Sequence, residues 1–174
     1  MSRLQGLAPV VSPATRVLVL GSFPGVRSLQ LGQYYAHPQN QFWRLLAHLW
    51  PQAPWPADAD YAGRCSCALA QGLGIWDVYA ACEREGSLDS AIRHAQLNDF
   101  GALLRRCPQL SGIAHNGGES HRHARAVEQS LVEAGLAARV KIHKLPSTSP
   151  ANASWTFDRK LAAWRAVMQE HGLV

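Results

Sequence analysis

Two segments of the sequence contain the residue types that can hold a heterocyclic ring and a water molecule. The first, residues 21–43, is rich in glycine, proline, aromatic and amide side chains. Glycine lets the backbone approach a ligand closely, and the Tyr35 ring has a flat face on which a base can stack. The Asn40 carboxamide has a donor and an acceptor, which are enough to hold a water molecule. The alternative interpretation is a proline-bent loop whose aromatic rings belong to the core.

The second segment, residues 145–152, has three consecutive hydroxyl side chains between two prolines. These are Ser147, Thr148 and Ser149, and the segment ends at Asn152. Hydroxyls and backbone amides in a stiff loop can contact a phosphate backbone, since a preformed turn loses little entropy on binding. A simple surface turn is the alternative.

Short apolar runs separated by amphipathic segments predict the elements that position these loops. Strands are predicted at about residues 16–20, 74–78, 110–115 and 139–145. Helices are predicted at about residues 40–50, 61–71, 87–94, 99–106, 119–134 and 156–171. Asn98 is placed to cap the helix that begins at residue 99. This alternation of strands and helices is typical of an α/β fold with a parallel sheet covered on both faces.

In such sheets ligands bind at the carboxyl ends of the strands. The loops that follow the four predicted strands are residues 21–41, 76–80, 115–121 and 145–153. We therefore expect Asp77 and Asn116, which belong to the second and third of these loops, to lie beside the two segments above. Asp77 could instead cap a helix, and Asn116 could belong to a simple turn.

Composition limits the classes of protein that this chain can represent. Its 174 residues, 47% hydrophobic and 17% charged, predict one globular domain over residues 1–174. The net charge of +5 suits a polyanionic partner such as nucleic acid, or a solvated basic surface. The sequence contains no apolar run near the roughly 20 residues that span a bilayer, and no signal peptide is apparent. We expect an intracellular, cytoplasmic protein without a membrane partner.

The four cysteines have spacings that do not match a zinc-binding motif. Four thiolates could formally hold an iron–sulfur cluster, but reduced and partly buried thiols are the expected state in a cytosolic chain. We predict neither a metal nor a cofactor.

Residues 21–25 read GSFPG, residues 34–43 read YYAHPQNQFW and residues 145–152 read LPSTSPAN. Together with WDV at 76–78 and GSLD at 86–89, these motifs resemble the uracil-DNA glycosylase superfamily, and within it the hypoxanthine-DNA glycosylase (DNA-deoxyinosine glycosylase) branch. The resemblance extends over about residues 16–165. It implies a three-layer α/β/α sandwich with a central four-stranded parallel sheet, and DNA crossing the carboxyl edge of that sheet.

The resemblance also assigns the catalytic residue. Most branches of the superfamily place Asp, Asn or Glu inside the first motif to position water, whereas this chain has Ser22 and Phe23 there. In the hypoxanthine branch this role belongs to the asparagine of the HPxN segment, which maps onto Asn40. This departure favours the hypoxanthine branch over the uracil-specific ones.

The other site residues follow from the same resemblance. Base-binding residues are expected to be Tyr35 and Phe23 as stacking or wall residues, Asp77 as the reader of the base edge, and Gly21, Ser22 and Asn116. DNA-binding residues are expected to be Ser147, Thr148, Ser149 and Asn152.

The expected activity is that of a monofunctional glycosylase of base excision repair. Its partner would be DNA containing a deaminated base, namely hypoxanthine and also uracil or xanthine, with no obligate protein partner. One alternative is a mismatch-directed glycosylase for uracil or thymine opposite guanine. Another is an inactive DNA-binding relative. The absence of an acid in the first motif favours this interpretation, and the presence of Asn40 argues against it.

Overall fold

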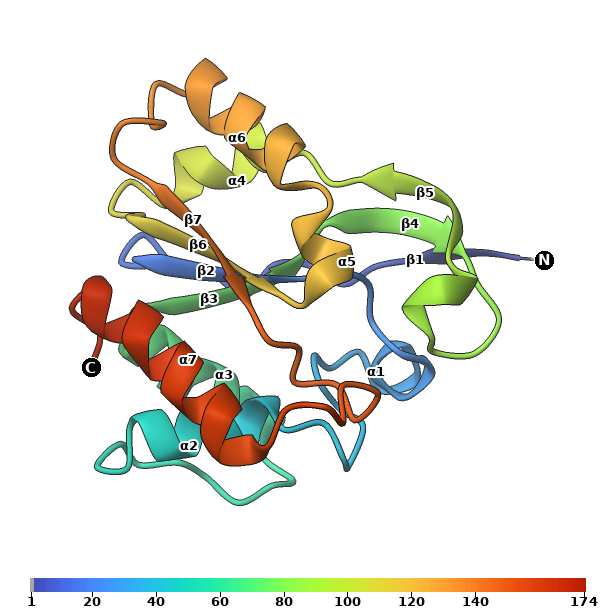
Figure 1. Cartoon of the computed structure of the whole chain (residues 1–174), viewed down its shortest axis with the longest axis horizontal. Helices are drawn as coiled ribbons and strands as arrows, with labels where there is room; N and C mark the ends of the chain where they lie inside the picture. Colours follow the sequence, from blue (N-terminus) through green and yellow to red (C-terminus); the bar gives the residue numbers. More distant parts are fainter. Residues whose placement is uncertain (1) are drawn as a thin grey trace.

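The main sheet has the four parallel strands that the sequence predicts. It is seen in the computed structural model of the chain, which describes residues 2–174 (Figure 1). The strands lie in the order β3-β2-β6-β7, with bounds β2 Val17–Gly21, β3 Leu73–Asp77, β6 Gly112–Asn116 and β7 Lys141–Leu145. All three neighbouring pairs are parallel. Every residue of β2, β3 and β6 is buried, as expected for strands covered on both faces.

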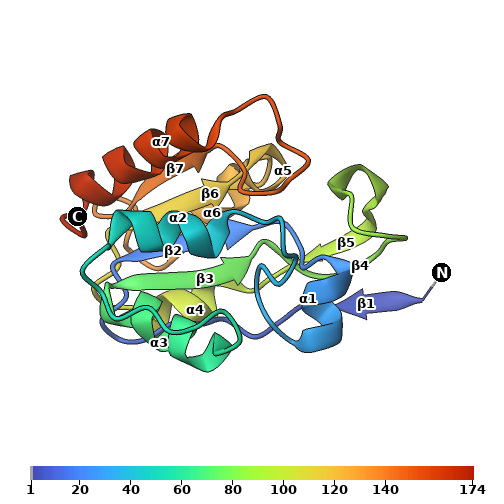
Figure 2. The same ribbon diagram turned by 90° about the horizontal axis from the view of Figure 1, so that it is seen from below.

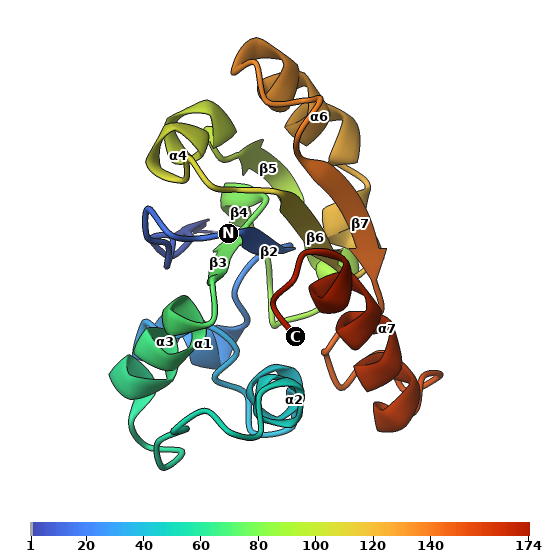
Figure 3. The same ribbon diagram turned by 90° about the vertical axis from the view of Figure 1, so that its left-hand side faces the viewer.

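Helices cover both faces of this sheet, which confirms the three-layer sandwich. The helices are α1 Val26–Leu31, α2 Phe42–Leu49, α3 Tyr61–Ala70, α4 Phe100–Arg106, α5 Gly118–His121, α6 Ala124–Glu133 and α7 Phe157–Glu170. Helices α4 and α6 lie on one face, and α2, α3 and α7 lie on the other (Figures 1 and 3). None of the helices in the described part of the chain is both long enough and apolar enough to cross a membrane.

A second, antiparallel sheet was not predicted. Its strands are β1 Arg3–Gln5, β4 Tyr79–Glu83 and β5 Arg93–Leu97, in the order β1-β4-β5. A single residue, Val78, separates β3 from β4, and this sheet projects beyond the carboxyl edge of the main sheet (Figure 2). The helix predicted at residues 87–94 is therefore wrong, because that segment forms the short 3-10 helix Asp89–Ala91 and the start of β5. Most residues of β5 are exposed, so the segment has no alternating apolar pattern that would predict a strand. It forms a strand because it pairs with β4.

Two smaller predictions also need correction. The helix predicted at residues 119–134 is divided into α5 and α6, with a break at Arg122 and His123. Asn98 does not cap α4, since the cap is Asp99, whose side chain accepts a hydrogen bond from the backbone N–H of Ala102 at 3.3 Å. The Asn98 amide instead donates to the carbonyl of Asp77 at 2.7 Å and thereby fixes the end of β3.

Candidate active site

A cavity of about 890 Å³ lies at the carboxyl ends of the main-sheet strands. Every residue predicted to bind the base, the water or the DNA lines it: Gly21, Ser22, Phe23, Tyr35, Asn40, Asp77, Asn116, Ser147, Thr148, Ser149 and Asn152. The residues come from segments far apart in the sequence, and the parallel topology brings them to one edge. The predicted loops therefore do share a cavity.

Asp77 is a buried carboxylate at the floor of this cavity. It is the last residue of β3 and pairs in register with Gly21, the last residue of β2. A side chain at position 21 would place its Cβ 2.4 Å from Asp77 Oδ1, so only glycine leaves room for the carboxylate. Asp77 is 5% exposed, and its Oδ2 is buried without a hydrogen-bond partner among residues 2–174. The chain continues into β4 after the single residue Val78, so Asp77 is not a helix cap.

The environment of Asp77 makes it easy to protonate. Burial, followed by the nearby charge of Asp89, raises the pKa of Asp77 from 3.8 to about 7, and the Arg84 cation acts in the opposite direction. The carboxyl group therefore changes charge near neutral pH. It accepts hydrogen bonds from a ligand when ionised and can donate one when protonated.

Tyr35 is held in place by contacts on its ring and its hydroxyl. Its φ of 55° lies in the left-handed region, which is unusual for a residue with a bulky side chain. The ring stacks on Phe42 with centroids 4.0 Å apart, and the hydroxyl accepts a hydrogen bond from Asn116 Nδ2 at 3.2 Å. Burial raises the pKa of Tyr35 above its usual value. The ring is thus a neutral, preset part of the cavity lining.

Asn116 joins the two predicted loops through Thr148. Its Oδ1 accepts from the Thr148 backbone N–H at 3.0 Å, and its Nδ2 donates to Thr148 Oγ1 at 3.0 Å. The Thr148 carbonyl accepts from the backbone N–H of Gln41 at 3.0 Å. Thr148 is 0% exposed, so its hydroxyl faces inward and is not available to phosphate. The DNA contact predicted for this side chain is corrected accordingly: Thr148 links residues 34–43 to residues 145–152.

Hydrogen bonds within residues 145–152 hold this loop in one conformation. The Ser149 N–H donates to Ser147 Oγ at 3.1 Å, and the Asn152 amide donates to the Ser147 carbonyl at 3.2 Å. Ser147, Ser149 and Asn152 remain partly exposed at the cavity. Their hydroxyl protons and free lone pairs can still meet a ligand, and ordering the loop on binding costs little.

Asn40 lies immediately before α2 with its side chain oriented by the backbone. Its Oδ1 accepts from the Phe42 N–H at 3.0 Å, and its own N–H donates to the His37 carbonyl at 2.9 Å. The N–H of Gln39 donates to His37 Nδ1 at 3.1 Å, so His37 orders this turn. A carbonyl oxygen has two lone pairs, and the second one on Asn40 Oδ1 can accept a hydrogen bond from water.

A segment that was not predicted to belong to the site, residues 87–89, closes the opposite wall. Ser22 Oγ donates to Asp89 Oδ1 at 2.7 Å, and Ser87 Oγ accepts from the Val26 N–H at 2.9 Å. Ser87 and Asp89 both line the cavity. The signal was present in the GSLD motif at residues 86–89, which carried the resemblance but was given no role.

Arg84 is the buried cation behind this wall. Its guanidinium donates to the carbonyls of Pro24 and Gly86 and lies 5.3 Å from the centre of the Phe23 ring. Arg84 is 5% exposed, and its Nη1 has no hydrogen-bond partner among residues 2–174. Phe23 is therefore packed as a wall residue, with one side covered by Arg84. A charged residue is rarely buried without a strong local reason, and nothing in its sequence context indicates this position.

Cationic groups that face solvent lie at the rim. Arg27 and Lys144 line the cavity and are exposed, as expected for contacts with phosphate. Among residues 2–174, only His143, Glu170 and His171 bring three possible metal ligands close to one another, and none of them lines the cavity.

The molecule is thus an α/β protein with a parallel sheet and a ligand-sized cavity at its carboxyl edge, with a buried carboxylate at the floor and cations at the rim. The sequence model of the uracil DNA glycosylase superfamily matches residues 8–168. The chain belongs to this superfamily.

The names of two similar proteins agree with this assignment. The chain is 34% identical over 165 residues to a hypoxanthine DNA glycosylase of Methanosarcina acetivorans, covering 95% of this chain and 98% of the relative. It is 37% identical over 116 residues to a hypoxanthine DNA glycosylase of Methanosarcina barkeri, covering 67% of this chain and 72% of the relative.

A solved structure has the same fold. It is a solution NMR structure of a protein from Methanosarcina acetivorans that is described as a candidate uracil DNA glycosylase. It superposes with a TM-score of 0.79 at 32% identity, covering 98% of this chain and 99% of that chain.

Proposed function

We propose that this protein is a monofunctional DNA glycosylase that removes hypoxanthine from DNA. The observation that carries the proposal is that the Asn40 carboxamide and the buried Asp77 carboxylate open into one cavity. The names of the two Methanosarcina relatives support the choice of base. Hydrolysis of the base–sugar bond requires only water as co-substrate.

The base must leave the duplex to reach this cavity. Flipping costs a few kcal/mol of lost stacking and pairing, and a mispaired base reduces that cost. The cavity of about 890 Å³ has room for a purine and its sugar. The Tyr35 ring, already fixed by Phe42 and Asn116, supplies a stacking surface without further ordering.

Asp77 supplies the base selectivity. Its ionised carboxylate can accept a hydrogen bond from the N1–H of hypoxanthine, whereas N1 of adenine has no proton to donate. Adenine would leave the carboxylate unpaired in a buried site, at a cost of about 1–3 kcal/mol. Since Asp77 Oδ2 has no partner among residues 2–174, an acceptor is already present for the substrate.

Asn40 orients the water that attacks the sugar. The water oxygen bonds to C1′ as the bond from C1′ to N9 breaks, and the bond electrons leave with the base as an anion. An amide does not titrate near neutral pH, so Asn40 directs the water through a hydrogen bond and does not remove its proton early. The water proton passes to solvent or to the departing base. Preorganised dipoles around the base must then provide much of the stabilisation.

The rim of the cavity holds the DNA backbone. Lys144 and Arg27 supply exposed cations, and residues 147–152 supply a pre-ordered turn. Lys144 is directed to phosphate in this proposal, so water and not an amine is the nucleophile. No strand cleavage is expected.

The Asn40→Ala variant tests the proposal. Excision of hypoxanthine should fall by about 10²-fold to 10⁴-fold, the range for losing a positioned proton-handling group, while binding to the same DNA persists. The matched control is Gln39→Ala, an exposed amide in the same turn that does not line the cavity. Turnover close to wild type in Asn40→Ala would contradict the proposal.

Substrate choice needs a separate measurement. Oligonucleotides with inosine, uracil, xanthine and mispaired thymine should rank hypoxanthine first. Preferred release of uracil or thymine opposite guanine would indicate a mismatch-directed enzyme. Binding without excision of any base would indicate an inactive relative.

A further inference from the structure

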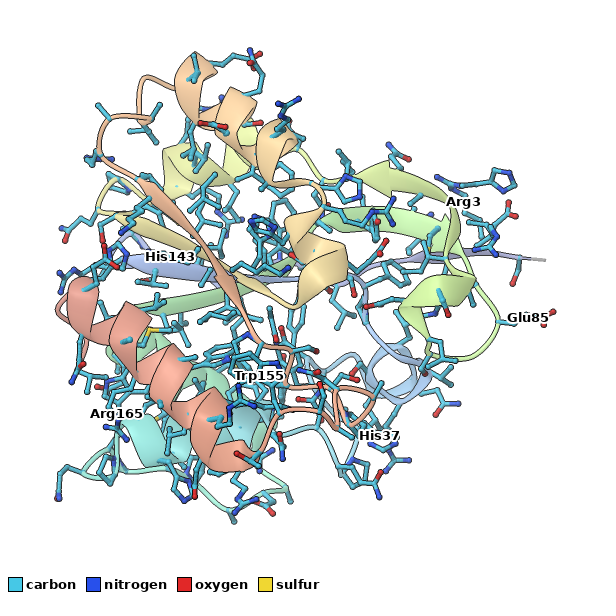
Figure 4. All side chains as sticks on the ribbon, in the orientation of Figure 1. Arg3, His37, Glu85, His143, Trp155 and Arg165 are labelled. Carbon is cyan, nitrogen blue, oxygen red and sulfur yellow. The ribbon has the colours of Figure 1, made fainter. Side chains whose placement is uncertain are left out.

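Three side chains that can bind metal come together away from the cavity. They are His143 in β7, Glu170 at the end of α7, and His171 immediately after it. One ligand atom from each lies within 4.8 Å of the other two. Figure 4 shows His143 beside the C-terminal end of α7, on the side of the molecule away from His37, which lines the cavity.

The two imidazoles already point toward each other. His143 Nε2 and His171 Nε2 are 2.8 Å apart, and the ring planes are nearly perpendicular at 88°. Glu170 Oε2 lies 3.9 Å from His143 Nε2. In a tetrahedral zinc site with Zn–N bonds of 2.0–2.1 Å, ligand nitrogens lie about 3.3 Å apart. A small rotation of the rings would open the pair to this distance.

His171 has a hydrogen-bonding partner behind its ring. Its Nδ1 contacts Ser111 Oγ at 2.9 Å, and that hydroxyl also lies 3.2 Å from the carbonyl of Arg16. In the tautomer that can bind a metal through Nε2, His171 Nδ1–H donates to Ser111 Oγ, and the hydroxyl proton is directed to the carbonyl of Arg16. The lone pair of His171 then lies on Nε2, directed at His143. Metal-binding histidines are typically held by this kind of second hydrogen bond.

The backbone beneath the ring also fits this arrangement. A Cβ at position 112 would lie 2.5 Å from His171 Nε2, so Gly112 makes room for the imidazole. His171 is 9% exposed and Glu170 is exposed, so one side of the cluster is packed and the other is open to solvent. An ion could enter from that open side.

The surrounding charges both favour and oppose a cation. The C-terminal end of a helix carries partial negative charge, and His171 is the C-cap of the 14-residue α7. Lys141 opposes the cation, but it bonds to Glu170 Oε1 and leaves Oε2 available. Arg16 is a second nearby cation, with its guanidinium on the His171 carbonyl.

We propose that His143, Glu170 and His171 form a site for Zn²⁺, with water as the fourth ligand. Imidazole and carboxylate groups are common zinc ligands. The ion would join the end of α7 to β7, the two elements that flank residues 146–156. Much of that segment forms a wall of the cavity, so the ion would have a stabilising role outside the reaction itself.

Titration of the full chain, without any histidine tag, with Zn²⁺ and with Co²⁺ as a spectroscopic substitute tests the site. We expect one equivalent to bind, a higher thermal midpoint, and a tetrahedral Co²⁺ spectrum without a thiolate band. The thiolate band separates this site from binding at the four cysteines. The His143→Ala and Glu170→Gln variants should each weaken binding by at least about tenfold, since even loss of an outer-shell partner costs 10–100-fold.

Two further variants make the result decisive. The control is His94→Asn, which removes the exposed His94–Glu83 pair, where the atoms are 3.1 Å apart, and it should leave binding unchanged. Asparagine is chosen there because His94 has a φ of 49°, in the left-handed region, which asparagine tolerates better than most residues. Lys141→Met should tighten binding by removing the opposing charge. The proposal is overturned if the wild type binds no metal, or if affinity survives both His143→Ala and Glu170→Gln.

Discussion

Replacing Asp77 with asparagine should stabilise the fold at pH 8 while reducing base selectivity. Burial raises the pKa of Asp77 from 3.8 to about 7. A difference of about 3 pKa units corresponds to about 4 kcal/mol. Because the folded-state pKa lies above the unfolded value, this stability is fully present below about pH 4 and is lost as the pH rises to about 7. Above that pH the wild type contains an unfavourable buried carboxylate.

Asparagine has the same shape and does not ionise. Its amide would occupy the position of Oδ2, which has no partner among residues 2–174, at a cost of about 1–3 kcal/mol. The net gain in unfolding free energy should therefore be about 1–3 kcal/mol at pH 8, with no gain near pH 4. Urea unfolding of both proteins at several pH values measures this difference.

The same substitution should change the pH dependence of excision. Wild-type activity on hypoxanthine should rise as the pH increases through about 7, since the ionised carboxylate is the acceptor for N1–H. In Asp77→Asn this rise should disappear, and discrimination against adenine should fall by about 5-fold to 150-fold, which corresponds to 1–3 kcal/mol. Equal pH slopes of stability in the two proteins, together with unchanged selectivity, would refute the reasoning.

Three other substitutions test the walls of the cavity. Gly21→Ala would place a methyl group 2.4 Å from Asp77 Oδ1. The unfolding free energy should therefore fall by about 1–3 kcal/mol, and excision should fall with it. Normal activity would show that the carboxylate can move. Asn116→Ala leaves the buried Thr148 N–H unpaired and should cost about 1–3 kcal/mol, measured by urea unfolding. Arg84→Lys keeps the charge but cannot hold the same two carbonyls in one plane, so single-turnover excision should drop about tenfold or more.

Local patterns in the chain were sufficient for the main sheet and the position of the site. The apolar, β-branched run at residues 17–20 predicts a buried strand, and glycines and prolines mark where the loops begin. Parallel strands end at a common edge, so loops as far apart in the sequence as residues 21–41 and 145–153 can be placed together before any coordinates are known. For this reason Asn40, Asp77 and the 145–152 loop were all found in one cavity.

Features that depend on distant partners could not be read in this way. The exposed strand Arg93–Leu97 exists because β4 offers it hydrogen bonds, and its own residues have no apolar period. Arg84 has the sequence context of a surface residue and is buried only because Pro24 and Gly86 come together around it. Thr148 turns inward because Asn116, 32 residues earlier, accepts and donates its hydrogen bonds. Hydrogen bonding between remote segments decides these positions, and it leaves no periodic signal in the sequence.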